Sequence, residues 1–254
     1  MPPPSHGSPG AILVTGAGSG IGAGCARELA RTGAPVVLVG RRRERLDEVA
    51  AAITEAGGAA HVLSWDIAAG EDAEPLLDAA EELAGPLGVL VHAAGNQVRA
   101  PAVALELEDF DAVVGLHLRA AFALSRGLAR RLIARDAPGS IVYIASLTSE
   151  RVGIPGTVAY ASAKSGLLGL MRTLAVEWGP HHIRVNAIAV GFVATEMTRD
   201  VDGTPARQAL VGRAPLGRLG EAAEIGTVAS FLTSDAARFV TGECVRVDGG
   251  WSIA

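Results

Sequence analysis

Short apolar runs alternate along this chain with longer segments in which apolar residues recur at helical spacing. Runs of this kind, bounded by glycine or polar residues, are typical of buried strands, and the longer segments are typical of amphipathic helices. The expected strands are Ala11–Thr15, Pro35–Gly40, His61–Ile67, Leu87–Gly95, Ser140–Ala145, Ile183–Ala189 and Gly242–Gly250. The expected helices are Ala23–Ala30, Leu46–Ala56, Ala73–Leu83, Phe110–Ala134, Thr157–Gly179 and Glu221–Ser234.

Strands and helices that alternate in this order predict an α/β fold, because parallel strands need crossover helices that cover both faces of the sheet. We expect a doubly wound parallel sheet of about seven strands, with ligands at the carboxyl ends of the strands. No repeat or linker divides the chain, so residues 11–254 form a single predicted domain. Residues 1–10 are rich in Pro, Gly and Ser and predict a disordered tail. The polar segment 191–220 is a candidate substrate lid.

A glycine-rich loop follows the first strand. Between Thr15 and the helix Ala23–Ala30 the sequence is Gly-Ala-Gly-Ser-Gly-Ile-Gly. Glycines let the backbone approach a pyrophosphate, whose charge then faces the unpaired amides of the helix N-terminus. A strand before the loop and a helix after it are the context that this motif requires. The loop therefore predicts a dinucleotide-binding Rossmann fold, with Gly16, Ser19, Gly20, Ile21 and Gly22 at the coenzyme.

The end of the second strand bears on the choice of coenzyme. In a dinucleotide-binding fold an acidic residue here selects the free ribose 2′-hydroxyl, whereas an arginine accommodates a 2′-phosphate. This chain has Gly40 followed by Arg41 and Arg42, which favours NADP(H) over NAD(H). The alternative is that both arginines belong to the solvated start of the next helix. Asp66, at the end of the third expected strand, is placed to face the adenine.

Composition narrows the class of protein. The net charge of −5 gives no reason to expect a nucleic-acid or membrane surface, and no apolar run reaches the length of a membrane span. Cys25 and Cys244 are too few for a disulfide framework and lack metal-ligand spacing, which predicts a reducing cytoplasm and no metal site. We interpret the pair His181–His182 as surface residues because no third ligand is suggested.

Lys164 is the only lysine among the 22 basic residues. A chain that otherwise uses arginine keeps a lysine where a compact ammonium with an adjustable pKa is needed. Tyr160, one of two tyrosines, lies four residues earlier, so a helix would bring both side chains to one face. A cation held there would lower the pKa of the phenol and make Tyr160 a proton donor and acceptor. Ser146 stands at the carboxyl end of its expected strand, where ligands are predicted.

With the glycine loop, Ser146, Tyr160 and Lys164 in this order, the sequence resembles the short-chain dehydrogenase/reductase family from about Ala11 to Trp251. The resemblance implies that Tyr160 is the acid/base, that Lys164 lowers its pKa and holds the nicotinamide ribose, and that Ser146 orients a substrate carbonyl. It also implies coenzyme contacts at Ile67, Ala94, Gly95, Gly191, Val193 and Thr195, the last with the carboxamide.

The sequence departs from the family pattern at four positions. His117 stands where the family has an Asn that supports a water relay to the lysine, and His92 and Ala93 replace two Asn of a turn. Val190 replaces the Pro before Gly191. Because a histidine carries protons near neutral pH, we expect His117 either to serve in an altered relay or to be a packed helix residue.

Within the family, Ser146–Glu150, Arg99–Pro101 and Asp248–Trp251 are most similar to gluconate 5-dehydrogenases and 2-dehydro-3-deoxygluconate dehydrogenases. We therefore expect interconversion of a secondary alcohol and a ketone on a sugar acid or polyol, with Arg99 or Arg151 meeting the acid group. One alternative is reduction of 3-oxoacyl thioesters, with the arginines of segment 191–220 meeting an acidic carrier protein. Another is a non-catalytic dinucleotide sensor. The resemblance also implies a homotetramer.

Overall fold

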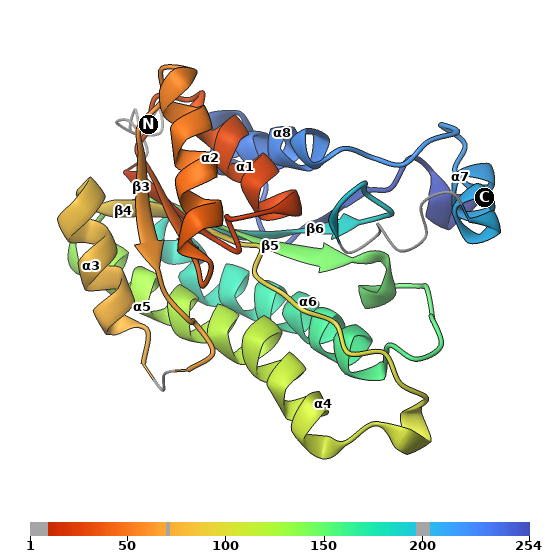
Figure 1. Ribbon diagram of the computed structural model, residues 1–254. Coiled ribbons are helices and arrows are strands. Elements are labelled where there is room, and N and C mark those ends of the chain that lie inside the picture. The colour runs from red at the N-terminus through yellow and green to blue at the C-terminus, as the bar shows by residue number, and fades with distance from the viewer. Residues whose placement is uncertain (1–9, 70–71, 197–203) are drawn as a thin grey trace.

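The apolar runs form one parallel sheet with helices on both faces, as predicted from the sequence (Figure 1). Its strands pair in the order β3-β2-β1-β4-β5-β6-β7. The computed structural model describes residues 10–69, 72–196 and 204–254, so the predicted tail lies outside the described residues except for Gly10. The strands are β1 (Ala11–Thr15), β2 (Val36–Gly40), β3 (Ala60–Ser64), β4 (Leu87–His92), β5 (Gly139–Ser146), β6 (Ile183–Val190) and β7 (Cys244–Val247).

Helices cover both faces of this sheet. They are α1 (Gly20–Ala30), α2 (Arg43–Glu55), α3 (Glu74–Ala84), α4 (Leu107–Val114), α5 (Ala120–Ala134), α6 (Val158–Trp178), α7 (Pro205–Arg213) and α8 (Ala222–Thr233). Figure 1 shows α1, α2 and α8 on one face and α3, α5 and α6 on the other. Strands β2 and β4 pair on opposite sides of β1, because the chain adds strands outward as far as β3 and then crosses back to add β4 on the other side. A ligand crevice opens in such folds between β1 and β4, where the strand order reverses.

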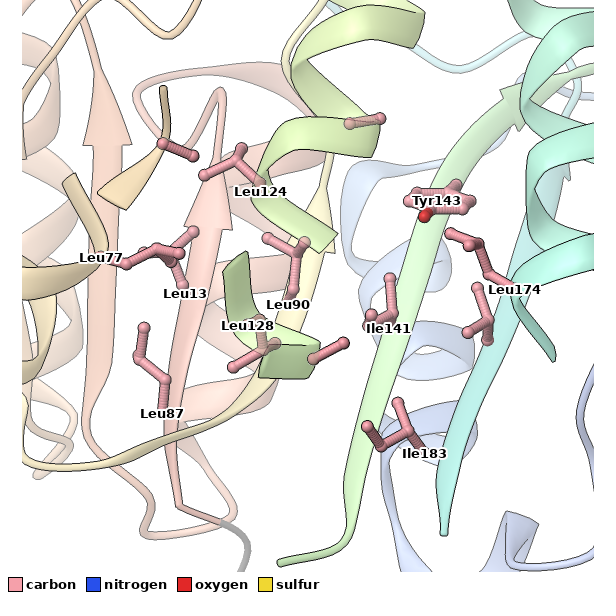
Figure 2. Close-up of a cluster of buried hydrophobic side chains, with 14 of the residues drawn as sticks. Leu13, Leu77, Leu87, Leu90, Leu124, Leu128, Ile141, Tyr143, Leu174 and Ile183 are labelled. Atoms are coloured by element: carbon pink, nitrogen blue, oxygen red, sulfur yellow. The ribbon is translucent and has the colours of Figure 1, made fainter. Parts of the chain in front are cut away.

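Residues of each strand alternate between two separate cores, because successive side chains of a strand point to opposite faces. Leu13 packs toward Leu77 of α3 and Leu124 of α5 (Figure 2), whereas its neighbour Ile12 packs on the side of α1 and α8. Both faces of the central strands are therefore buried. This explains why they appear in the sequence as continuous apolar runs and not as an alternating pattern.

The helix expected at Phe110–Ala134 begins earlier, at Leu107, and contains a π-helical turn, η2 (Gly115–Arg119), between α4 and α5. The extra residue of a π turn locally breaks the regular helical spacing, and such turns are frequent at functional sites. His117 lies in this turn and is buried. The joined helix Leu107–Ala134 is long and apolar enough to cross a membrane, but half of its apolar window is buried inside the fold.

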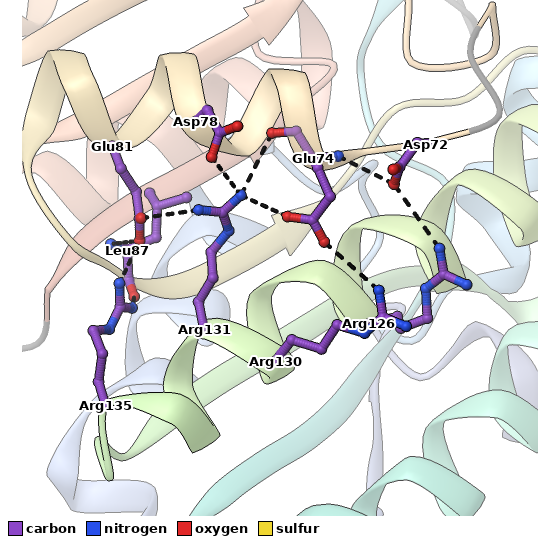
Figure 3. A network of polar contacts seen from close by, with 9 residues as sticks. All are labelled: Asp72, Glu74, Asp78, Glu81, Leu87, Arg126, Arg130, Arg131 and Arg135. Carbon is purple, nitrogen blue, oxygen red and sulfur yellow. Dashed lines mark hydrogen bonds and ion pairs between the residues drawn. The ribbon is translucent and has the colours of Figure 1, made fainter.

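A network of ion pairs joins α3 to α5 (Figure 3). The guanidinium of Arg131 contacts the carboxylates of Glu74 at 2.6 Å, Asp78 at 2.7 Å and Glu81 at 3.2 Å. Its side chain is only 18% exposed, so these contacts are less screened by solvent than ordinary surface pairs. Arg131 therefore holds α3 against the helix that carries the π turn.

We expect Arg131→Ala to lower the free energy of unfolding by roughly 1–3 kcal/mol, because it leaves three carboxylates close together without their shared cation. Arg130→Ala is the matched control. Arg130 is 64% exposed and lies 3.9 Å from Glu74, so its loss should change stability by less than about 0.5 kcal/mol. Urea denaturation of both variants measures the difference, and equal losses would contradict the special role of Arg131.

Candidate functional site

A cavity of about 410 Å³ opens at the carboxyl ends of the strands, as the fold predicts. The residues that follow β1, β2, β3, β4 and β6, and the end of β5, form its wall. Segments that lie far apart in the sequence meet here. The predicted site residues that line it are Gly16, Ser19, Gly20, Ile21, Gly22, Arg41, Arg42, Asp66, Ile67, Ala94, Gly95, His117, Ser146, Tyr160, Lys164, Gly191, Val193 and Thr195.

The glycine loop has the tight geometry that its sequence predicts. Gly16 has a φ of +67°, and a Cβ there would lie 2.7 Å from the Cα of Ala94. A Cβ on Gly22 would lie 2.2 Å from the carbonyl oxygen of Gly16. Ser19 is the N-cap of α1, but its side chain makes no cap hydrogen bond. The loop therefore presents the first amides of α1 at the cavity, which fits the pyrophosphate of a dinucleotide.

Arg42 crosses from the end of β2 to the glycine loop and donates a hydrogen bond to the Oγ of Ser19 at 2.9 Å. The guanidiniums of Arg42 and Arg45 also each lie 3.5 Å from the carboxylate of Glu196, which follows Thr195. Glu196 lines the cavity and was not predicted as a site residue. Its only signal in the sequence is that an acidic residue directly follows Thr195. Nothing in the sequence shows that Arg42 and Arg45, which lie 154 and 151 positions earlier, would reach it.

Tyr160 and Lys164 lie on the first two turns of α6, as their spacing predicts, and both line the cavity. The Nζ of Lys164 lies 5.6 Å from the centre of the Tyr160 ring and donates a hydrogen bond to the carbonyl of Ile144. Lys164 is 3% exposed, and this burial lowers its pKa to about 7. Its surroundings thus shift the pKa of the ammonium, as we expected of the only lysine.

The pKa of Tyr160 is raised in this structure, and the predicted lowering by Lys164 stays a prediction. Burial raises the pKa of the phenol, and the opposing influence is a hydrogen bond from the hydroxyl of Ser146. The physical reason is that burial disfavours the charged phenolate more than the hydroxyl of Ser146 stabilises it. Tyr160 is therefore a protonated phenol at neutral pH, suited to donate a proton.

A family model described as enoyl-(acyl carrier protein) reductase matches residues 16–252 of the chain. Gluconate 5-dehydrogenase of Gluconobacter oxydans is 37% identical over 246 residues, which cover 95% of this chain and 94% of that protein. The chain belongs to the short-chain dehydrogenase/reductase family. It is an oxidoreductase that acts on CH–OH groups and their carbonyl counterparts.

Two other similar members of the short-chain dehydrogenase/reductase family are named for different classes of substrate. The 3-oxoacyl-[acyl-carrier-protein] reductase of Pseudomonas aeruginosa is 37% identical over 238 residues, covering 94% of this chain and 95% of that protein. The crystal structure of a gluconate 5-dehydrogenase from Burkholderia cenocepacia, in complex with NADP and tartrate, is 34% identical and superimposes with a TM-score of 0.90. That match covers 98% of this chain and 97% of the other.

The two histidines that replace family asparagines are buried in this short-chain dehydrogenase/reductase. Thr15 Oγ1 accepts hydrogen bonds from the amides of Ala93 and Ala94, so its own proton is left for Nδ1 of His92 at 3.1 Å. This contact fixes the turn after β4 without the usual asparagines. Burial, followed by the charge of Lys164, lowers the pKa of His92 to about 3.

His117 lies between Gly95 and Tyr160. A Cβ on Gly95 would lie 2.3 Å from the Cε1 of His117, and the rings of His117 and Tyr160 meet edge to face at 5.4 Å. Its Nε2 lies 2.8 Å from the carbonyl oxygen of Asn96. Burial, followed by the charge of Lys164, lowers the pKa of His117 to about 2. The desolvated ring is therefore neutral near neutral pH, and a proton relay through His117 stays a prediction.

The expected lid region lies beside Ser146. Its residues 197–203 fall outside the described part of the chain, but Phe192, Leu210 and Ala214 pack against Trp251 and Leu147, the residue after Ser146. Arg99 and Arg151, expected to meet an acid group, are exposed, and neither lines the cavity. The cations in the described wall are Arg41, Arg42 and Lys164.

Proposed function

We propose that the enzyme interconverts a secondary alcohol and a ketone of a sugar acid or polyol by hydride transfer, with NADP(H) as its preferred coenzyme. The observation that carries this proposal is one cavity with a proton-transfer group at one end and two arginines at the other. Ser146, Tyr160 and Lys164 meet at the first end, and Arg41 and Arg42 follow β2 at the second. The gluconate and polyol dehydrogenases among the relatives support the substrate class.

In this proposal Tyr160 is the general acid when a carbonyl is reduced. The raised pKa of the phenol keeps its proton available at neutral pH. The hydroxyl of Ser146 stabilises the substrate oxygen as negative charge develops on it. Lys164 holds the nicotinamide ribose and, with its pKa near 7, exchanges protons at the inner end of the site. The coenzyme supplies the hydride or accepts it.

At the coenzyme end, Gly16, Ser19 and the first turn of α1 would hold the pyrophosphate. Arg42 would meet a 2′-phosphate, since its guanidinium already reaches across the cavity mouth to Ser19 and Glu196. Asp66 and Ile67 would border the adenine, and the residues from Ala94 to Gly95 and from Gly191 to Thr195 would border the rest of the coenzyme. Structures of similar enzymes with bound NADP support this preference.

Reduction of 3-oxoacyl thioesters is the second candidate, and the Pseudomonas aeruginosa relative favours it. It needs a basic surface beside the lid for an acidic carrier. Arg218 is held there by Glu224 in two contacts of 2.8 and 2.6 Å, and the guanidinium of Arg213 stacks 3.8 Å from the ring centre of Trp251. These two arginines are already engaged within the protein, so we rank this candidate below the sugar acids and polyols.

We also propose a cytoplasmic homotetramer. Phe122 and Ile133 on α5 and Val176 on α6 are exposed apolar side chains on helices that cover one face of the sheet. Apolar groups gathered on neighbouring helices are typical of subunit interfaces. Sedimentation equilibrium would test this assembly, and a monomer at micromolar concentration would contradict it.

Turnover tests the function directly. We would incubate the enzyme with gluconate, D-threitol, galactitol and a 3-oxoacyl thioester, with each coenzyme, and follow the absorbance of the reduced nicotinamide. Oxidation of the sugar acid or polyols is the expected result. Turnover of the thioester alone would support the second candidate. Coenzyme binding without turnover of any CH–OH or carbonyl compound would favour a sensor.

Arg42→Ala should weaken NADPH binding by about 10- to 100-fold and change NADH binding by less than about 2-fold, because it removes a charged hydrogen-bond donor that only the 2′-phosphate would use. Glu196→Gln should act in the opposite direction and tighten NADPH binding by about 2- to 5-fold, because the carboxylate that competes with the 2′-phosphate for Arg42 is lost. Fluorescence titration of the nicotinamide measures both affinities.

Arg43→Ala is the matched control for Arg42→Ala. Arg43 pairs with Asp47 at 3.3 Å on the surface of α2 and does not line the cavity, so its loss should leave both affinities unchanged. Wild-type enzyme that binds NADH as tightly as NADPH would contradict the coenzyme preference and leave the reaction itself in place.

A further inference from the structure

The hydroxyl of Ser146 is held by Thr148, two residues further along the chain. The Oγ of Ser146 accepts one hydrogen bond from the backbone amide of Thr148 at 3.2 Å and a second from the hydroxyl of Thr148 at 3.0 Å. A serine hydroxyl has two lone pairs and one proton. Both acceptor positions of Ser146 are therefore filled from one side, and only its proton remains for a further partner.

That proton has one direction left. Ser146 and Tyr160 both line the cavity, and the Ser146 hydroxyl acts to lower the pKa of the phenol, which is the influence of a donor that faces the phenol oxygen. A substrate oxygen that approaches Tyr160 would meet the same proton. Without the Thr148 hydroxyl, one lone pair of Ser146 would be open, and the serine could rotate and act as an acceptor instead of a donor.

The turn that carries Thr148 is fixed to the helix that carries Tyr160. Ser146 is the N-cap of the short 3-10 helix η3 (Leu147–Ser149), and its backbone amide donates to the Oγ of Ser149 at 3.1 Å. From α6, the hydroxyl of Ser165 donates to the carbonyl oxygen of Ser149 at 3.3 Å. Ser165 directly follows Lys164, so the turn and the two proton-transfer residues keep a constant relative position.

We propose that Thr148 is a positioning residue that makes Ser146 an obligatory hydrogen-bond donor toward the reacting oxygen. The role rests on the proposed function, because it specifies how Ser146 stabilises the substrate oxygen there. The backbone bond from residue 148 forms with any side chain, so the part that the sequence specifies is the Thr148 hydroxyl. Valine has nearly the same shape without this hydroxyl, and serine keeps the hydroxyl without the methyl group.

The kinetic test compares Thr148→Val with Thr148→Ser on the substrate that the wild type turns over. Thr148→Val should lower kcat by about 3- to 10-fold, the usual effect of one hydrogen bond, with KM and NADPH affinity within about 2-fold of wild type. Thr148→Ser should restore kcat. In a Ser146→Ala background Thr148→Val should cost nothing further, because the hydroxyl would have no serine to orient. An equal loss of kcat in that background would overturn the proposal.

A second readout does not depend on turnover. The chain has two tyrosines, so Tyr160 is the only phenol in a Tyr143→Phe background. In that background the onset of tyrosinate absorbance should move to higher pH with Thr148→Val and stay in place with Thr148→Ser, because a weaker donor at Ser146 stabilises the phenolate less. An unchanged onset with Thr148→Val would overturn the positioning role. A wild-type enzyme without turnover would overturn only the proposed function, since this titration would still report on Thr148.

Discussion

Tyr160→Phe is expected to lower kcat by about 10²- to 10⁴-fold, the usual contribution of general acid–base catalysis, while NADPH affinity changes by less than about 2-fold. Tyr160 lines the cavity together with Ser146, and its ring centre lies 5.6 Å from the Nζ of Lys164. Phenylalanine keeps the ring and its edge-to-face contact with His117 but has no proton to transfer. Steady-state kinetics and coenzyme titration of the same preparation measure both effects.

The pH dependence of the wild type should follow the state of this phenol. Because the pKa of Tyr160 is raised, the proton donor is present at neutral pH and the proton acceptor appears only in alkaline solution. The kcat for oxidation of the alcohol should therefore rise with pH, and the kcat for reduction of the ketone should not.

Tyr143→Phe is the control for Tyr160→Phe. Tyr143 is also fully buried and shares a hydrogen bond of 2.7 Å with Ser125, but it does not line the cavity. Its loss should reduce stability by about 1 kcal/mol and leave kcat unchanged. If Tyr160→Phe retained more than about a tenth of the wild-type kcat, another group would have to supply the proton.

Lys164→Met is expected to abolish most turnover and at the same time to stabilise the fold at neutral pH. Burial lowers the pKa of Lys164 from 10.5 to about 7, so the folded state is penalised whenever the lysine would be charged. This pKa shift corresponds to a destabilisation of the folded wild type by at most about 5 kcal/mol. We expect a gain of roughly 1–3 kcal/mol at pH 7, because Lys164→Met also leaves the carbonyl of Ile144 without its donor.

The stabilisation by Lys164→Met should depend on pH in a defined direction. The penalty on the wild type is largest below the folded pKa of about 7 and disappears as the pH rises toward the unfolded value of 10.5. The stabilisation by Lys164→Met should therefore be larger at about pH 6 than at about pH 9, as thermal unfolding at both values would show. Lys164→Arg is the control, since a guanidinium cannot discharge and should destabilise the fold at both values. A stabilisation by Lys164→Met that grows with pH would contradict a lysine whose pKa is lowered by burial.

The fold and most of the residues that line the cavity follow from patterns in the sequence. Continuous apolar runs bounded by turns predict a parallel sheet, and the order of a parallel sheet places the residues after each strand at one edge. Gly16 to Gly22, Arg41 and Arg42, Ser146, and Tyr160 with Lys164 all meet there because strand ends and helical spacing are local properties. Local properties are what a sequence pattern records.

The protonation states of these groups depend on packing between distant segments. The raised pKa of Tyr160, the pKa of Lys164 near 7 and the neutral ring of His117 all result from burial by segments far apart in the chain. The contact of Glu196 with Arg42, 154 positions away, and the π turn that brings His117 inward also depend on packing. Desolvation depends on everything that surrounds a side chain, so it cannot be inferred from the spacing of residues along the chain.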